Sequence, residues 1–151
     1  MKKFAKITAV ALVAILALAV LVACGPTSNP QKALDALKEN GYVTAGSAIA
    51  SNGLTAKVAC DAEGVTLGVK SGELIAVITG VKLEEKEKEK DVEGNSVTIY
   101  YFSSADVAKT AWEGTKIQEI KKQNENDKNY VIKLSGSMIY MGTKEGVKAA
   151  R

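Results

Sequence analysis

The sequence contains no histidine among its 151 residues, and it has two cysteines and two prolines. Without histidine the chain cannot build a Ser-His-Asp or Cys-His catalytic group, or a metal site with imidazole ligands. It also lacks a Cys-x-x-Cys pair for redox chemistry, because Cys24 and Cys60 lie far apart in the sequence. We therefore expect no catalytic residue, no metal and no cofactor, and an enzyme is the less favoured class of function.

The chain begins with a basic and then apolar segment that is typical of a bacterial export signal. Lys2, Lys3 and Lys6 precede the 17 residues from Ile7 to Ala23, which apart from Thr8 are all apolar or small. A membrane-spanning helix needs about 20 such residues, so hydropathy alone fits either a signal or a span. The residues that follow the run must decide between the two.

The end of this run, Leu21-Val22-Ala23-Cys24, resembles the lipobox of bacterial lipoproteins. That resemblance implies cleavage between Ala23 and Cys24 and a diacylglyceryl group on the Cys24 thiol, with fatty acids such as palmitate as the anchor. Two acyl chains hold a protein on a membrane where one gives marginal binding. Two alternatives are an ordinary signal cleavage after Ala17-Leu18-Ala19 and an uncleaved N-terminal anchor.

Removal of residues 1–23 changes what the charge of the chain means. The net charge of +3 comes from 20 basic and 17 acidic side chains, and the removed segment holds three lysines and no acidic residue. The remaining 128 residues then carry 17 basic and 17 acidic side chains. A neutral mature chain gives no reason to expect nucleic acid as a partner.

The rest of the sequence predicts one α+β domain at residues 30–151, after a short linker at 24–29. Asn29 and Pro30 are typical of a helix N-terminus, and Asn40-Gly41 of its C-terminus. Alternating apolar residues or apolar runs predict strands at 42–49, 54–60, 64–70, 74–83, 96–102, 130–134 and 138–142. We expect one mainly antiparallel sheet with helices on one face. The alanine-rich segment 46–61 fits a helix as well as a strand.

Two further helices are expected in the C-terminal half. Ser103-Ser104 precedes a long helix in which Gly114 predicts a bend or an early end. Trp112 is expected in the core beneath this helix. Ile117 falls on the opposite helical face from Trp112. A hairpin then follows, and Thr143 is expected to cap a short last helix.

Acidic residues offer the remaining candidate chemistry. The run 82–93 alternates lysine with carboxylates and predicts a solvated loop. Asp61, Glu63 and Glu73 could serve acid–base catalysis if they converged in a buried pocket. Cys60 is expected to be a small buried residue, and it is left unpaired if Cys24 carries lipid.

Three further segments resemble small lipoproteins of Gram-positive bacteria that have no assigned function. They are the phrases "ALKENGYVT" (36–44), "IYYFSSADVAKTAW" (99–112) and "SGSMIYMGTKEGVKAA" (135–150), about a third of the mature chain. The resemblance implies an exported α+β domain on the outer face of a single membrane, and it supplies no catalytic residues.

The sequence thus favours a lipid-anchored protein on the extracytoplasmic face of the cell membrane. We expect a non-enzymatic binding module for a protein or other component of the cell envelope. The alternative is a carboxylate-based envelope enzyme or an enzyme inhibitor. A receptor of an uptake system is disfavoured by size, because such receptors usually need two lobes around a cleft and 128 residues supply one domain.

Overall fold

The computed structural model describes residues 25–85 and 92–151, and it confirms the α+β class. Within these ranges one five-stranded antiparallel sheet has the strand order β1-β2-β3-β5-β4. The strands are β1 (Ala48–Ile49), β2 (Leu74–Glu85), β3 (Val92–Phe102), β4 (Tyr130–Ser135) and β5 (Met138–Thr143). The helices are α2 (Pro30–Glu39), α3 (Leu54–Thr66), α4 (Ala105–Glu113), α5 (Thr115–Gln123) and α6 (Lys144–Ala149), with a 3-10 turn at Ala50–Asn52.

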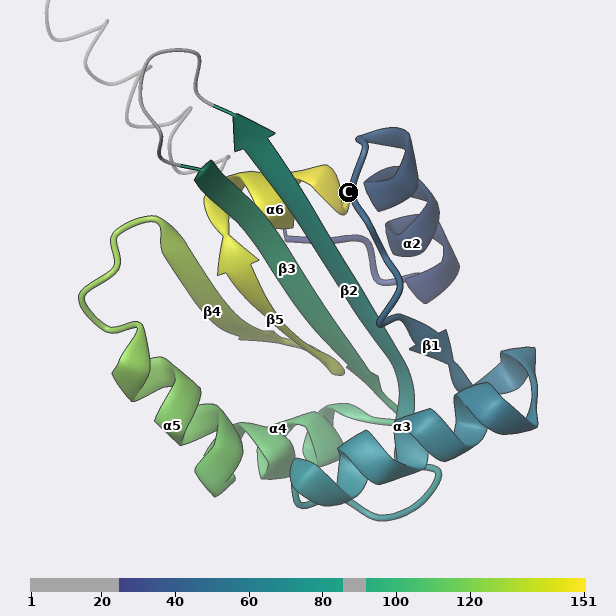
Figure 1. The fold of residues 1–151 in the computed structure, drawn as a ribbon. Coiled ribbons are helices and arrows are strands. Elements are labelled where there is room, and N and C mark those ends of the chain that lie inside the picture. Colours follow the sequence, from purple (N-terminus) through teal and green to yellow (C-terminus); the bar gives the residue numbers. More distant parts are fainter. Residues whose placement is uncertain (1–24, 86–91) are drawn as a thin grey trace, which may run out of the picture.

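Helices cover both faces of the sheet, and not one face as the sequence predicts. On one face, α2 and α6 pack on Ile78, Ile99 and Tyr140. On the other, α4, α5 and the turn after α3 pack on Val77, Tyr100 and Phe102. Figure 1 shows α3, α4 and α5 in an arc apart from α2 and α6. Because β2, β3 and β5 carry apolar side chains on both faces, each face needs a covering layer.

Strand β3 follows the predicted alternation, but neither of its faces reaches solvent. Tyr100 and Phe102 belong to one core cluster, and Val97, Ile99 and Tyr101 belong to the other. All five residues are at most 6% exposed. The helices α2 and α6 cover the second set. With Tyr100, Tyr101 and Phe102 buried, β3 offers no aromatic surface on which a base could stack.

The helix predicted after β3 is interrupted at Gly114, as its glycine indicates. Gly114 has an extended backbone (φ −68°, ψ 152°), which ends α4 and begins α5. This break changes the direction of the chain, so that Ile117 is fully buried in spite of its expected position opposite Trp112. Trp112 itself is half-buried at the edge of the core, and the Lys121 ammonium lies 4.2 Å from its ring centroid.

The segment 54–70 is the main correction to the predicted secondary structure. Residues 54–66 form the helix α3 in place of one strand and part of a second, and turns follow up to β2. Residues 61–64, between the two predicted strands, therefore lie inside a helix, and a turn at 71–73 precedes β2. Of the strand expected at 42–49, the two residues of β1 and a single bridge between Val43 and Val81 are found.

The two ends of the charged run 82–93 form strands and not a solvated loop. Lys82 pairs with Asn95, and Glu84 pairs with Glu93, so both ends of the run continue the β2–β3 ladder. The middle of the run, residues 86–91, lies outside the described residues. Alternating charged residues suit a hairpin arm of this kind because water can solvate both of its faces. None of the helices described is long and apolar enough to cross a membrane.

Candidate functional site

The predicted lipidation residues Ala23 and Cys24 lie outside the described residues, and the chain directly after them packs on the domain. Pro26 is buried, and the Thr27 amide donates a hydrogen bond to the Ala150 carbonyl oxygen at 3.1 Å. The Tyr101 hydroxyl donates to the Thr27 carbonyl oxygen at 2.8 Å. Residues 25–29 of the predicted short linker therefore pack against the sheet face that carries α2 and α6.

Gly25 begins this docked segment against the ring of Tyr140. A Cβ atom at Gly25 would lie 2.9 Å from the Tyr140 hydroxyl oxygen, so the close approach requires glycine. Burial raises the pKa of Tyr140, and the positive charge of Arg151 acts in the opposite direction. Gly25 and Arg151 thus both lie near the Tyr140 ring.

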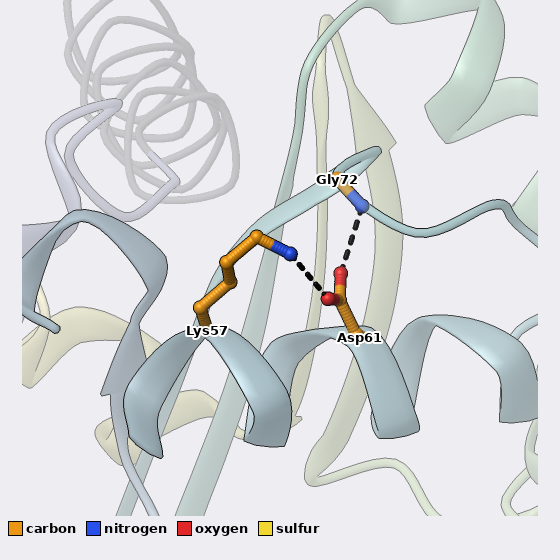
Figure 2. Close-up of polar contacts among 3 residues, drawn as sticks. All are labelled: Lys57, Asp61 and Gly72. Atoms are coloured by element: carbon orange, nitrogen blue, oxygen red, sulfur yellow. Dashed lines mark hydrogen bonds and ion pairs between the residues drawn. The ribbon is translucent and has the colours of Figure 1, made fainter. Parts of the chain in front are cut away.

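The three carboxylates that could support acid–base chemistry make separate interactions. Asp61 accepts hydrogen bonds from the Lys57 ammonium at 2.6 Å and the Gly72 amide at 2.8 Å, as Figure 2 shows. Glu63 accepts from the Tyr100 hydroxyl at 2.9 Å, and Glu73 accepts from the amide of Lys70. None of the three is buried, so the convergence that an enzyme of this type requires is absent among them.

The contacts of Asp61 indicate a structural role. The hydrogen bond from Lys57, followed by the one from Gly72, lowers its pKa below the ordinary aspartate value. Gly72 has a positive φ of 81°, which favours glycine in this turn. Asp61 therefore ties the middle of α3 to the turn that leads into β2.

The outer face of α3 is the most apolar exposed surface among the described helices. Leu54 is 77% exposed, Val58 58% and Val65 71%. Together with the exposed Ala62 they follow a spacing of four, four and three residues, which places them along one side of the helix. We call these four residues the α3 apolar stripe.

The inner face of α3 explains how such a helix packs. Cys60 and Gly64 are buried, and Ala56 is half-buried one turn before them. The Cys60 thiol donates to the Ala48 carbonyl oxygen at 3.7 Å, and a Cβ atom at Gly64 would lie 3.3 Å from a Val69 methyl carbon. Small residues on this side allow the helix to lie close to β1 and β2. The prediction that Cys60 is buried is confirmed, but it is buried in a helix.

The sequence contains a helical spacing in this segment, but the same residues also alternate as a strand does, and the alternation led to the strand prediction. Ala56, Cys60 and Gly64 recur every four residues, as the stripe residues Leu54, Val58 and Ala62 do. These two spacings are those of a helix with a small inner face and an aliphatic outer face. The same letters between 54 and 60 also alternate with period two, which predicted a strand.

A second surface feature is a polar pocket between the end of α2, the β2–β3 arm and α6. Its lining includes both signs of charge, with Lys82 and Lys148 beside Glu84 and Glu145. Tyr42 lies at this pocket, and burial together with the charges of Glu145 and Glu84 raises its pKa. The mixed charges favour water or a small polar group over an apolar partner. In the described part of the chain, no group of three acidic or cysteine residues could hold a metal ion.

Comparison with known proteins found no matching family model, curated protein or solved structure.

Proposed function

We propose that this chain is a lipid-anchored protein on the extracytoplasmic face of the cell membrane, and that its domain binds a protein partner through the α3 apolar stripe. The anchor is supported by the sequence of lysines, apolar run and Leu21-Val22-Ala23-Cys24. The binding module is supported by one structural observation, the exposure of Leu54, Val58 and Val65 on one side of a well-packed helix.

The stripe favours a protein partner because its chemistry is aliphatic. Full burial of a valine or leucine side chain contributes about 1.5–3 kcal/mol of favourable free energy. Three such residues can therefore form the apolar centre of an interface. The Lys57–Asp61 ion pair lies on the same helix and supplies a polar margin. A partner with a shallow apolar groove, able to receive one helix face, fits this surface.

Site-specific photo-crosslinking in intact cells tests the binding surface. A photoreactive amino acid at Val58 should give a discrete crosslinked product, and the substitution Leu54→Lys should remove it. The same photoreactive group at Glu113, an exposed position on α4, is the matched control. Equal products from both positions, or a product that survives Leu54→Lys, would contradict binding through the stripe.

The anchor has its own test. A cell grown with a labelled fatty acid should incorporate the label into this protein, and Cys24→Ala should abolish the incorporation. Label that persists in the Cys24→Ala variant would exclude Cys24 as the attachment point. The control Cys60→Ala should leave incorporation unchanged, because the Cys60 thiol is fully buried.

A further inference from the structure

We propose that the polar pocket between α2, the β2–β3 arm and α6 binds a small zwitterion, a molecule of amino-acid size that carries one ammonium and one carboxylate group. The pocket has a volume of about 490 Å³. Pockets that bind small molecules usually have volumes of about 300–1,000 Å³. Figure 1 shows α2 and α6 apart from α3. The site is therefore separate from the α3 apolar stripe, and it depends neither on that stripe nor on a lipid anchor.

The pocket carries one unpaired charge of each sign. Lys82 and Glu84 form an ion pair with each other, with 3.4 Å between the ammonium nitrogen and a carboxylate oxygen. Glu145 and Lys148 line the same pocket, and within the described residues neither of them forms an ion pair. A carboxylate and an ammonium that share a cavity without pairing can bind the two ends of a zwitterion. A ligand with a single charge would leave one of them unmatched.

Tyr42 adds a hydroxyl group that the fold does not use. The residue is 8% exposed, and its hydroxyl makes no hydrogen bond within residues 25–85 and 92–151. Every fully buried side-chain oxygen in these ranges has a partner, so the Tyr42 hydroxyl is not enclosed and opens into the pocket that Tyr42 lines. A hydroxyl donates one hydrogen bond and accepts others, so it can contact either end of the ligand.

The ring of Tyr42 is held in place by the fold itself. The Tyr42 amide donates a hydrogen bond to the Leu37 carbonyl oxygen at 2.9 Å. A Cβ atom at Gly80 of β2 would lie 3.2 Å from the Cδ1 atom of Tyr42, so the glycine allows the ring to lie directly on the strand. The Lys82 ammonium lies 6.0 Å from the ring centroid. A group that is fixed before binding loses little conformational entropy when a ligand arrives.

Two asparagine side chains at the pocket offer one acceptor and one donor. The Asn40 side-chain nitrogen donates to the carbonyl oxygens of Ala36 and Ala149, at 2.9 and 3.2 Å. Its oxygen is left as an acceptor for an ammonium group. The Asn95 side-chain oxygen accepts from the Thr143 hydroxyl at 3.0 Å, which leaves its nitrogen as a donor for a carboxylate. Both asparagines line the pocket, so its neutral groups match both ends of a zwitterion.

NMR spectroscopy of the full protein in detergent micelles, with isotope-labelled asparagine, tests the site. Glycine, β-alanine and γ-aminobutyrate supply both charges at increasing separation, and acetate and methylammonium supply one charge each. We expect at least one of the zwitterions to cause saturable shifts of the Asn40 and Asn95 side-chain signals, and the singly charged probes to bind about tenfold more weakly. The signal of Asn124, which lies beside α5, should not move. The absence of shifts with all three zwitterions, or equal binding of acetate or methylammonium, would overturn the proposal.

Matched variants test the two charges. Glu145→Gln and Lys148→Gln should each weaken binding of the zwitterion about tenfold. Glu39→Gln and Lys144→Gln, at exposed positions outside the pocket, are the controls and should leave binding unchanged. A native Asn124 signal shows that each variant is folded. Binding that survives both pocket substitutions would overturn recognition of a zwitterion.

Tyr42→Phe tests the hydroxyl without disturbing the ring. Binding should weaken by about two- to tenfold, which corresponds to the loss of one hydrogen bond. The midpoint of urea unfolding without ligand should stay the same, because the hydroxyl has no partner in the fold. Unchanged binding in this variant would overturn the role of Tyr42 in the site.

Discussion

The Tyr101 hydroxyl donates a hydrogen bond to the carbonyl oxygen of Thr27, 74 residues earlier in the chain, at 2.8 Å. Tyr101 is 3% exposed on β3, and burial raises the pKa of its phenol, so the hydroxyl stays protonated and remains a donor at physiological pH. The bond fixes the start of the folded domain to the middle of the sheet.

Tyr101→Phe should release the docked segment with a modest loss of stability. One neutral hydrogen bond contributes about 0.5–1.5 kcal/mol to the free energy of unfolding. Hydrogen exchange at the Thr27 amide should become faster because its bond to Ala150 loses support. Tyr100→Phe is the matched control, since it removes the bond to Glu63 and leaves the segment in place. Unchanged exchange at Thr27 in the Tyr101→Phe variant would show that the segment docks without this bond.

Thiol titration should distinguish the two cysteines. Burial raises the pKa of the Cys60 thiol, so little reactive thiolate forms and a thiol reagent should not react in the folded protein. In denaturant the mature protein should yield one thiol, and its Cys60→Ser variant none. Two thiols in denaturant would mean that Cys24 is unmodified, and a fast native reaction would mean that Cys60 is accessible.

Asp61→Asn should destabilise the protein at neutral pH and have little effect in acid. The pKa of Asp61 is lowered in the folded state, first by Lys57 and then by Gly72, so its contribution is present above the ordinary aspartate pKa of about 4. The contribution declines as the pH falls through the lowered pKa. Urea unfolding of both proteins between pH 2 and pH 7 measures this difference. If the difference in free energy of unfolding between the two proteins is the same at every pH, the effect of Asp61→Asn does not come from the loss of the Asp61 charge.

Gly146→Ala should destabilise the protein although alanine favours helices by about 1 kcal/mol. Gly146 lies in α6, and a Cβ atom there would overlap the Ser96 carbonyl oxygen of β3. Backbone must move to accommodate it, at a cost of about 1–3 kcal/mol. Gly64→Ala in α3 is the control because its nearest neighbour is a side-chain methyl at 3.3 Å. Urea unfolding should show the larger loss for Gly146→Ala, and the reverse order would contradict the close contact of α6 with β3.

Several local features could be predicted because their hydrogen bonds close within a few residues. Asn29, Ser104 and Thr143 each accept a bond from the amide three residues later, which caps a helix. Gly136, with φ of 57°, forms the hairpin turn between β4 and β5. In each of these cases the residue type and its immediate neighbours are sufficient.

Other features were decided by distant parts of the chain. The segment 54–66 has both helical and strand periodicity, and the helix forms because small residues on one side can pack against β1 and β2. Ile117 is buried because the break at Gly114 redirects α5 toward the core. The same distinction holds for the candidate site. The motif at Cys24 can be recognised in the sequence, whereas the exposure of the α3 apolar stripe depends on which side of α3 the rest of the chain covers.

The sequence by itself determined the α+β class, the helix caps, the C-terminal hairpin and the pattern that predicts a lipid at Cys24. The tertiary structure decided that both faces of the sheet are covered, that residues 25–29 dock on Tyr101, and that α3 exposes an aliphatic side. The physical reason is the range of the interactions. Capping bonds and turns act between near neighbours, whereas burial of a face depends on residues that are brought together from far along the chain.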